Sequence, residues 1–309
     1  MREGYVTSMV VVTNASAGGA DGDGLDAALA VLRAASDVRV ERCSDPADLD
    51  RVLGTLDGRT LVLAGGDGTV HTAVGRLRAR GDDLSPERPL GLIPLGTGND
   101  LARTLGIPLD PGDAARALLS GRPRTLDLGV DEEGGVVVNA VHVGVGAEAA
   151  ARAGSLKARL GPAAYPVGSL LAGVGSTGWD LRVTVDGIPV HAAGTVLMVA
   201  IANGRSIGGG AELAPDAVPD DGLLDVVVAT STGPLSRLGF GVAMREGEHV
   251  DRDDVLMAQG RTVTVAGDPF PLNADGELAG PVTSRSWTVE PRAWAVLVSR
   301  PPTSSDGSG

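Results

Sequence analysis

Three residue types are scarce in this sequence, and each shortage excludes a class of protein. Cys43 is the only cysteine among the 309 residues, so no internal disulfide and no cysteine-rich zinc site can form. Aromatic residues make up 2% of the chain, which leaves few platforms on which nucleic acid bases could stack. Lys157 is the only lysine and lies in no Gly-rich loop, which argues against a Walker A loop and against a protein kinase.

Positive charge and long apolar runs are also scarce. The chain has 26 basic and 39 acidic residues and a net charge of -13, which disfavours broad electrostatic binding to DNA, RNA or a strongly anionic membrane. No apolar run reaches the length of a membrane span, and Met9–Val12 is too short for the core of a signal peptide. We therefore expect a cytoplasmic protein without a nucleic acid partner.

Apolar residues make up 43% of the chain, enough for a sizeable core, and in residues 1–127 they follow an alternation of strands and helices. Such alternation predicts a three-layer α/β domain with a mainly parallel sheet. The expected strands are Met9–Thr13, Val38–Arg42, Leu61–Ala64 and Leu90–Ile93. The expected helices carry Leu25–Leu32, run from Pro46 through Leu53 and from Thr69 to Arg80, begin near Asp100, and run from Pro111 to Ser120.

After Asp127 strand patterns dominate, so residues 128–292 are predicted to form a β-rich domain, a sandwich or an open barrel. A more helical segment, 147–174, interrupts it, and Asp186-Gly187 is typical of a two-residue hairpin turn. A final strand is expected at about 293–300; the sequence leaves open to which sheet it belongs, and it could return to the first domain. Residues 301–309 are predicted to be a disordered tail. The expected strands are Val136–His142, Asp180–Val185, Thr195–Ala202, Leu223–Ala229, Arg261–Val265, Ser286–Val289 and Trp294–Val298.

Three loops rich in small residues follow predicted strands of the first domain. They are Asn14-Ala15-Ser16, Gly65-Gly66-Asp67-Gly68-Thr69 and Gly96-Thr97-Gly98-Asn99-Asp100. Ligands of such sheets bind at the carboxyl ends of the strands, and a Gly-rich turn before a helix presents N–H groups to a phosphate. Each loop alone could equally be a capped turn, because Asn, Asp and Gly also supply turns and helix caps. Together they predict one anion site at the sheet edge.

Asp67 is the unusual member of that predicted site. A carboxylate beside phosphates is repelled unless a cation lies between them. Because the Gly-rich loops contain no lysine, the charge of phosphates would have to be met by backbone N–H groups, arginine and metal. The sequence therefore indicates a divalent cation.

The combination of motifs resembles the diacylglycerol kinase catalytic-domain family, whose relatives include sphingosine and ceramide kinases. The resemblance covers most of residues 9–298. GGDGT alone is shared with NAD kinases and phosphofructokinases, so the later motifs make the resemblance specific. The matching segments are Gly65–Thr69, Pro94–Asp100, Leu126–Gly129, Asn203-Gly204 with Gly208–Gly210, Ala214–Val226 and Asp275-Gly276-Glu277.

The resemblance implies an ATP cleft, a metal network and a catalytic carboxylate. Asp275 would be the general base, and Glu277 would orient that site; without the resemblance, a plain turn is the better interpretation of Asp275-Gly276. Asp221 with the Leu223 carbonyl resembles the family's separate structural metal site, against the alternative of a hairpin turn. The residues implied for ATP are Asn14, Ser16, Gly65, Gly66, Asp67, Gly68, Thr69, Gly96, Thr97, Gly98 and Asn99, and those implied for Mg²⁺ are Asp67, Asp100 and, through water, Asp127.

The chain departs from the family pattern in two loops. Ala15 stands where proline usually follows the asparagine, and His71-Thr72 stands where Asn-Glu is common. His71 falls on the first turn of the predicted helix, where it could contact the ligand or be an ordinary half-buried histidine. The other histidines, His142, His191 and His249, show no metal-ligand spacing.

The family implies an ATP- and Mg²⁺-dependent kinase for the free hydroxyl of diacylglycerol or a related lipid. The apolar residues of 160–174 would form a lipid groove, a membrane-contact surface or ordinary core. Contact with the inner face of the membrane would be peripheral and hydrophobic. Two alternatives stay open: a kinase of a soluble alcohol such as NAD, and a nucleotide-binding regulatory protein without catalysis. The sequence also leaves a homodimer open.

Overall fold

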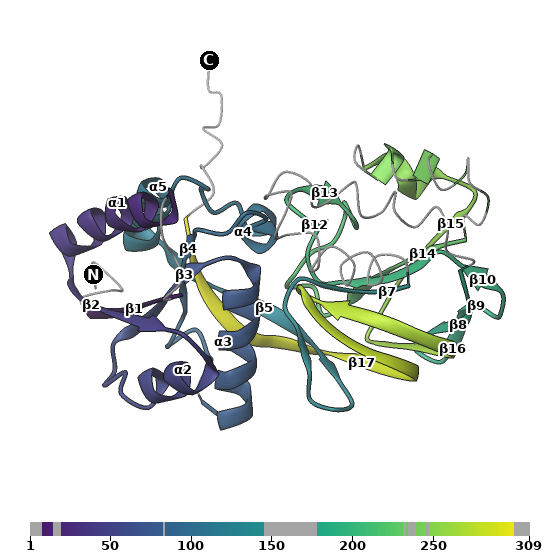
Figure 1. Ribbon diagram of the computed structural model, residues 1–309, viewed down its shortest axis with the longest axis horizontal. Coiled ribbons are helices and arrows are strands. Elements are labelled where there is room, and N and C mark those ends of the chain that lie inside the picture. The colour runs from purple at the N-terminus through teal and green to yellow at the C-terminus, as the bar shows by residue number, and fades with distance from the viewer. Residues whose placement is uncertain are drawn as a thin grey trace, which may run out of the picture.

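The structure is a computed structural model that describes residues 8–14, 20–82, 84–144 and 178–299, apart from several positions between 231 and 246. The first part of the chain forms a parallel sheet with strand order β2-β1-β3-β4. Figure 1 shows α1 and α5 on one side of this sheet and α2 and α3 on the other. Its elements are β1 (Ser8–Asn14), α1 (Ala20–Ala35), β2 (Asp37–Cys43), α2 (Pro46–Leu53), β3 (Thr60–Gly65), α3 (Asp67–Arg80), β4 (Gly91–Pro94), α4 (Asp100–Leu105) and α5 (Pro111–Ser120).

Local chemistry sets the helix ends in this domain. Asp45 caps α2 by accepting a hydrogen bond from the Asp48 amide, and Asp110 caps α5 in the same way, each with proline at the first helical position. The core between the layers is aliphatic, built from Val, Leu and Ala of the strands and of the inner helix faces. The predicted α/β domain with its parallel sheet is confirmed.

The rest of the chain forms a large antiparallel sheet, at the right of Figure 1, with the path β15-β14-β11-β7-β16-β17-β5-β6 and β8, β9 and β10 beside it. The predicted β-rich second domain is confirmed. Its elements are β5 (Arg122–Asp131), β6 (Val136–Val137), β7 (Ala140–Gly144), β8 (Trp179–Val185), β9 (Ile188–His191), β10 (Thr195–Val196), β11 (Met198–Ala202), β12 (Ser206–Ile207), β13 (Ala211–Glu212), β14 (Leu224–Ala229), η3 (Glu248–Asp251), β15 (Val255–Gly260), β16 (Thr262–Ala274) and β17 (Glu277–Val298).

Several strand predictions were wrong in their extent. The predicted strand Val136–His142 is divided into β6 and β7, because the backbone at Val138 and Asn139 turns its amides to the Asp275 carboxylate. Ser286–Val289 and Trp294–Val298 belong to one long strand, β17, which has a register shift between Glu290 and Trp294. The strand β5 was not predicted. The turn at Asp186-Gly187 joins β8 and β9, as predicted.

The end of β17 lies against the first domain. Val296 forms a parallel bridge with Leu90, next to β4, and the Leu90 amide donates to the Ala295 carbonyl at 2.8 Å. Trp294, Val296 and Leu297 belong to the same buried cluster as the parallel sheet. Figure 1 shows β5 and β17 running from the large sheet into the N-terminal half.

The predictions for Ser16, for the segment 147–174 and for the tail 301–309 lie outside the described residues. Within the part of the chain that is described, no helix is long and apolar enough to span a membrane.

Candidate active site

The second and third Gly-rich loops meet backbone to backbone at the ends of β3 and β4. A Cβ atom on Gly96 would lie 2.5 Å from the Gly66 Cα, so only glycine allows this approach. Gly65 is covered by the Thr69 side chain, whose hydroxyl would lie 2.2 Å from a Cβ at that position. The backbones of two predicted phosphate loops are therefore in direct contact.

Asp67 holds the two loops together. Its carboxylate accepts hydrogen bonds from the amides of Asp100 (3.1 Å) and Leu101 (3.0 Å), the first amides of α4. Asp67 thus stabilises the N-terminus of a helix, where a negative charge is favoured. Just before α4, Asn99 adopts a left-handed conformation (φ 52°), and its side chain closes the loop through hydrogen bonds with the Gly96 amide (3.0 Å) and carbonyl (2.6 Å).

Asp100 ties these loops to the second domain. Its carboxylate accepts hydrogen bonds from the amides of Gly209 (3.0 Å) and Gly210 (2.9 Å). Burial raises the pKa of the Asp100 carboxyl above its ordinary value, and the charge of Asp67 raises it further, against the lowering by the two amides. Gly98 lies between the carboxylates, since its Cβ would fall 3.1 Å from one oxygen of each.

The pair of Asp67 and Asp100 fits a divalent cation shared with phosphates. Mg²⁺ in nucleotide sites uses one or two carboxylates together with phosphate oxygens and water, rather than a cage of protein ligands. Among the described residues, no cluster of three or more His, Cys, Asp or Glu able to hold a metal occurs. A cation between the two carboxylates would offset both the burial and the charge of Asp67 that raise the pKa of Asp100.

Asp275 lies in a turn and is also a buried hydrogen-bond acceptor. Asp275-Gly276 forms the two-residue hairpin turn between β16 and β17, and both residues have positive φ (51° and 100°). The Asp275 side chain is only 1% exposed. It accepts hydrogen bonds from three consecutive amides, those of Val138 (2.7 Å), Asn139 (2.9 Å) and Ala140 (2.9 Å).

His71 brings this turn to the first domain. It is the fifth residue of α3, two positions after the GGDGT motif, and its Nδ1 is 3.0 Å from Oδ2 of Asp275. Burial lowers the pKa of His71, but the hydrogen bond and charge of Asp275 and the charge of Glu277 outweigh it, so the net shift is upward. This contact joins residues 204 positions apart and places the DGE turn beside the phosphate loops.

The other residues predicted for ATP lie around these contacts. Thr97 and Gly68 are exposed on their loops, and Asn14 is exposed at the end of β1. Glu277 is exposed at the start of β17, near enough for its charge to act on His71. Of the predicted set, the structure brings together Gly66, Asp67, Gly96, Asn99 and Asp100, with Asp275 attached through His71.

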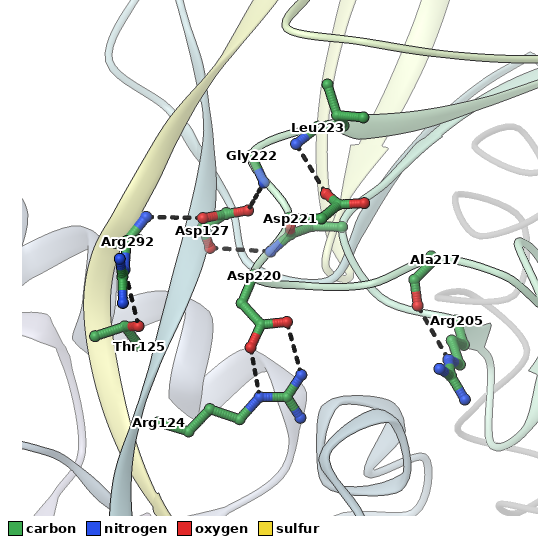
Figure 2. Close-up of polar contacts among 11 residues, drawn as sticks. Arg124, Thr125, Asp127, Arg205, Ala217, Asp220, Asp221, Gly222, Leu223 and Arg292 are labelled. Atoms are coloured by element: carbon green, nitrogen blue, oxygen red, sulfur yellow. Dashed lines mark hydrogen bonds and ion pairs between the residues drawn. The ribbon is translucent and has the colours of Figure 1, made fainter.

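Asp127 is placed differently from the other predicted metal residues. It is completely buried, and its carboxylate accepts hydrogen bonds from the amides of Gly222 (2.6 Å) and Arg292 (2.7 Å). Figure 2 shows Asp127 between the backbone of Arg292 and the turn that contains Gly222. Its carbonyl accepts hydrogen bonds from Asn203 and Trp294. Among the described residues, these contacts connect Asp127 to the backbone around it rather than to Asp67 or Asp100.

The predicted structural metal residues lie in the same turn. The Asp221 carboxylate is exposed and accepts a hydrogen bond from the Leu223 amide at 2.9 Å (Figure 2). Beside it, Asp220 forms a two-bond ion pair with Arg124 of β5, at 2.9 and 2.8 Å. Asp221 and Leu223 are therefore adjacent, but they belong with Asp127 and not with the Gly-rich loops.

Arg103 is a site residue that the sequence reasoning missed. It lies on α4, its Nε donates to the Gly98 carbonyl at 3.2 Å, and a Cβ on Gly210 would lie 3.6 Å from its guanidinium. The side chain is exposed, and no carboxylate of the described residues forms a salt bridge with it. The signal available in the sequence was an arginine one helical turn after Asp100 in a site without lysine.

Comparison with protein-family models gives two matches along the chain. Residues 8–130 match the diacylglycerol kinase catalytic domain, and residues 139–298 match the YegS C-terminal NAD kinase beta sandwich-like domain. Together with the two-domain fold, these matches define a kinase that transfers phosphate to an alcohol group. The chain belongs to the diacylglycerol kinase catalytic-domain family, and the predicted resemblance is confirmed.

Individual relatives agree with this assignment. A protein of Xanthomonas campestris pv. campestris (strain 8004), named "Probable lipid kinase YegS-like", is 32% identical over 290 residues, covering 87% of this chain and 89% of that protein. A protein of the same name from Pseudomonas aeruginosa is 37% identical over 233 residues, covering 71% and 70%. The crystal structure of a diacylglycerol kinase from Bacillus anthracis str. Sterne has a TM-score of 0.70 at 18% identity, covering 94% of this chain and 96% of that one, and so shares the fold.

Proposed function

We propose that this kinase transfers the γ-phosphate of ATP to the free hydroxyl of diacylglycerol or a related lipid, with Mg²⁺ as cofactor. The observation that carries the proposal is the contact between His71 and Asp275 at 3.0 Å. It joins the first turn after the GGDGT loop to the DGE turn of the second domain. A phosphate donor on the loops and an acceptor hydroxyl at Asp275 would then meet at one place.

The chain's own residues would bind and position the donor. Phosphoryl transfer needs alignment and neutralisation of charge more than covalent chemistry from the protein. The amides of the two Gly-rich loops and the α4 N-terminus supply donors. The guanidinium of Arg103, held at the loop by the Gly98 carbonyl, supplies the positive charge that a lysine gives in other kinases. Asp67 and Asp100 would hold Mg²⁺, which when bound neutralises the phosphate oxygens.

We propose that Asp275 supplies the basic group at the acceptor hydroxyl, either by itself or through His71, which it contacts at 3.0 Å. As a buried carboxylate with fixed hydrogen bonds, it has a single orientation and keeps its charge close to His71. The acyl chains of the acceptor would need an apolar surface. The segment 160–174, proposed for that surface from its sequence, lies outside the described residues.

The test is an assay with labelled ATP and Mg²⁺ against diacylglycerol, other lipids with free hydroxyls, and NAD. We expect label in the diacylglycerol fraction, and loss of that label in Asp275→Ala. Label in NAD alone would favour a kinase of a soluble alcohol. ATP binding with no transfer to any hydroxyl would favour a regulatory protein and would refute the proposed kinase activity.

A further inference from the structure

Asp275 has no lone pair left for a substrate proton. A carboxylate offers about four acceptor positions, two on each oxygen. Oδ1 accepts from the amides of Asn139 and Ala140, and Oδ2 accepts from the amide of Val138 and contacts Nδ1 of His71. A hydroxyl that approached the carboxylate directly would have to displace one of these four donors from a side chain that is 1% exposed.

His71 has the free lone pair that Asp275 lacks. An ionised carboxylate only accepts hydrogen bonds, so the contact with Asp275 fixes the proton of a neutral imidazole on Nδ1 and leaves the lone pair on Nε2. No described residue forms a hydrogen bond with Nε2, and the side chain is 16% exposed. His71 is therefore oriented as a proton acceptor toward whatever ligand occupies the site.

The position of His71 on the chain supports the same conclusion. It lies near the start of α3, four residues after Asp67 and two after Thr69, at the end of the helix that faces the Gly-rich loops. A group held there by Asp275 is within one helical turn of the proposed phosphate site. The buried carboxylate can then stabilise the imidazolium that forms when Nε2 takes a proton.

We propose that Nε2 of His71 takes the proton of the lipid hydroxyl, and that Asp275 is the positioning residue that holds the imidazole. This rests on the proposed function. As the hydroxyl oxygen forms its bond to the γ-phosphorus, its proton moves to Nε2. The bond from that phosphorus to the β–γ bridging oxygen breaks, and its electron pair leaves with ADP. The imidazolium, paired with Asp275, afterwards releases the proton to solvent.

The inference predicts a dependence of the rate on pH. His71 accepts a proton only when neutral, and the charged groups that act on it are Asp275 and Glu277, which raise its pKa above the ordinary 6.5. The value of kcat/KM should therefore rise with pH through a midpoint above 6.5 in the wild-type chain. Removing the imidazole should remove this rise.

The decisive variant is His71→Asn. Asparagine keeps an N–H near the Nδ1 position for Asp275 but has no atom in place of Nε2. We expect kcat to fall about 100-fold, with KM for ATP nearly unchanged, and the rise of kcat/KM with pH to disappear. His191→Asn, a substitution of a half-buried histidine in β9, should retain the wild-type rate and pH profile.

A second variant distinguishes loss of the proton acceptor from damage to the fold. In His71→Ala, added imidazole should restore part of the lost rate, which damage to the fold could not produce. The inference is overturned if His71→Asn keeps the wild-type rate, or if its rate falls while the pH profile keeps its midpoint. A wild-type chain that phosphorylates no lipid would instead refute the proposed function, and this proton path with it.

Discussion

Asp127 and Asp275 are both buried carboxylates fixed by backbone amides, yet they are connected to different parts of the molecule. Within the described part of the chain, the Asp127 carboxylate accepts hydrogen bonds only from backbone amides, those of Gly222 and Arg292. Asp275 binds three amides and also an ionisable side chain of the other domain, His71. Burial of a carboxylate and hydrogen bonds from amides to its oxygens are therefore not sufficient to identify it as catalytic. We propose that the contact of Asp275 with a second ionisable group, His71, is what distinguishes the two carboxylates.

The same contrast separates Asp67 from Asp221. Both accept hydrogen bonds from amides close in space, but Asp67 lies where two Gly-rich loops and a helix N-terminus converge. Asp221 is exposed in a turn beside β14. One pair, Asp67 and Asp275, belongs to the proposed reaction, and the other, Asp127 and Asp221, belongs to the proposed support of the fold. Substitutions in each pair test whether its residues serve the reaction or the fold.

The largest effect is expected for Asp275→Asn. The amide group of asparagine would face a backbone N–H, and the charge that orients His71 would be lost. Because Asp275 acts through His71, we expect kcat/KM for lipid phosphorylation to fall about 100-fold, as in His71→Asn. Asp268→Asn, in β16 but outside the site, is the matched control, measured in the same assay. A variant at Asp275 that keeps a tenth of the activity would show that this carboxylate is not needed.

Asp67→Asn should change the dependence on Mg²⁺. Asparagine can still accept from one α4 amide, so the fold should persist, but the charge opposite the phosphates is lost. The Mg²⁺ concentration for half-maximal rate should rise about 10–100-fold. This is measured by titrating the rate with Mg²⁺ at fixed ATP. An unchanged titration would remove Asp67 from the proposed metal site.

Asp127→Asn should affect stability and spare the chemistry. One of the two buried amides would lose its acceptor and face an N–H group, at a cost of about 3 kcal/mol in the free energy of unfolding. Urea denaturation measures this loss, and kcat per folded molecule should stay near the wild-type value. If stability held while kcat collapsed, Asp127 would belong to the reaction after all.

The smallest effect is expected for Asp221→Ala. Loss of one exposed hydrogen bond to the Leu223 amide should cost less than about 1 kcal/mol. If Asp221 holds a separate cation as proposed, Mg²⁺ at ten times its dissociation constant stabilises the wild-type chain by about 1.4 kcal/mol, and the variant loses this gain. Melting curves with and without Mg²⁺ test it. Equal shifts in both proteins would place the bound ion elsewhere.

Local chemistry explains why much of the fold was predictable. Asp45-Pro46 and Asp110-Pro111 specify helix starts within a few residues, and both aspartates cap their helices in the structure. The long strand β17 was predicted only in pieces, because Pro281 and Pro291 interrupt its pattern. The strand β5 was not predicted because its first half, from Arg122, is polar and pairs with β17, which is distant in the sequence.

The motifs of the site could be predicted from the sequence, but the hydrogen bonds that connect them could not. The Gly-rich loops could be placed at strand ends from the sequence alone. That Asp67 caps α4, or that Asp100 reaches Gly209, depends on how separate loops pack. The saturation of Asp275 depends on amides more than 130 residues away in the chain. A departure from the family pattern, His71, proved to be one of the contacts between the two domains.

A double-mutant cycle on His71 and Asp275 tests most directly whether the two residues act as one group. His71→Asn, Asp275→Asn and the double variant are compared by kcat/KM for phosphate transfer from ATP to diacylglycerol. If the imidazole and the carboxylate work together, the double variant should be no slower than Asp275→Asn alone, because residues that act as a unit are not additive. Losses that multiply across the two positions would show independent functions and contradict the account.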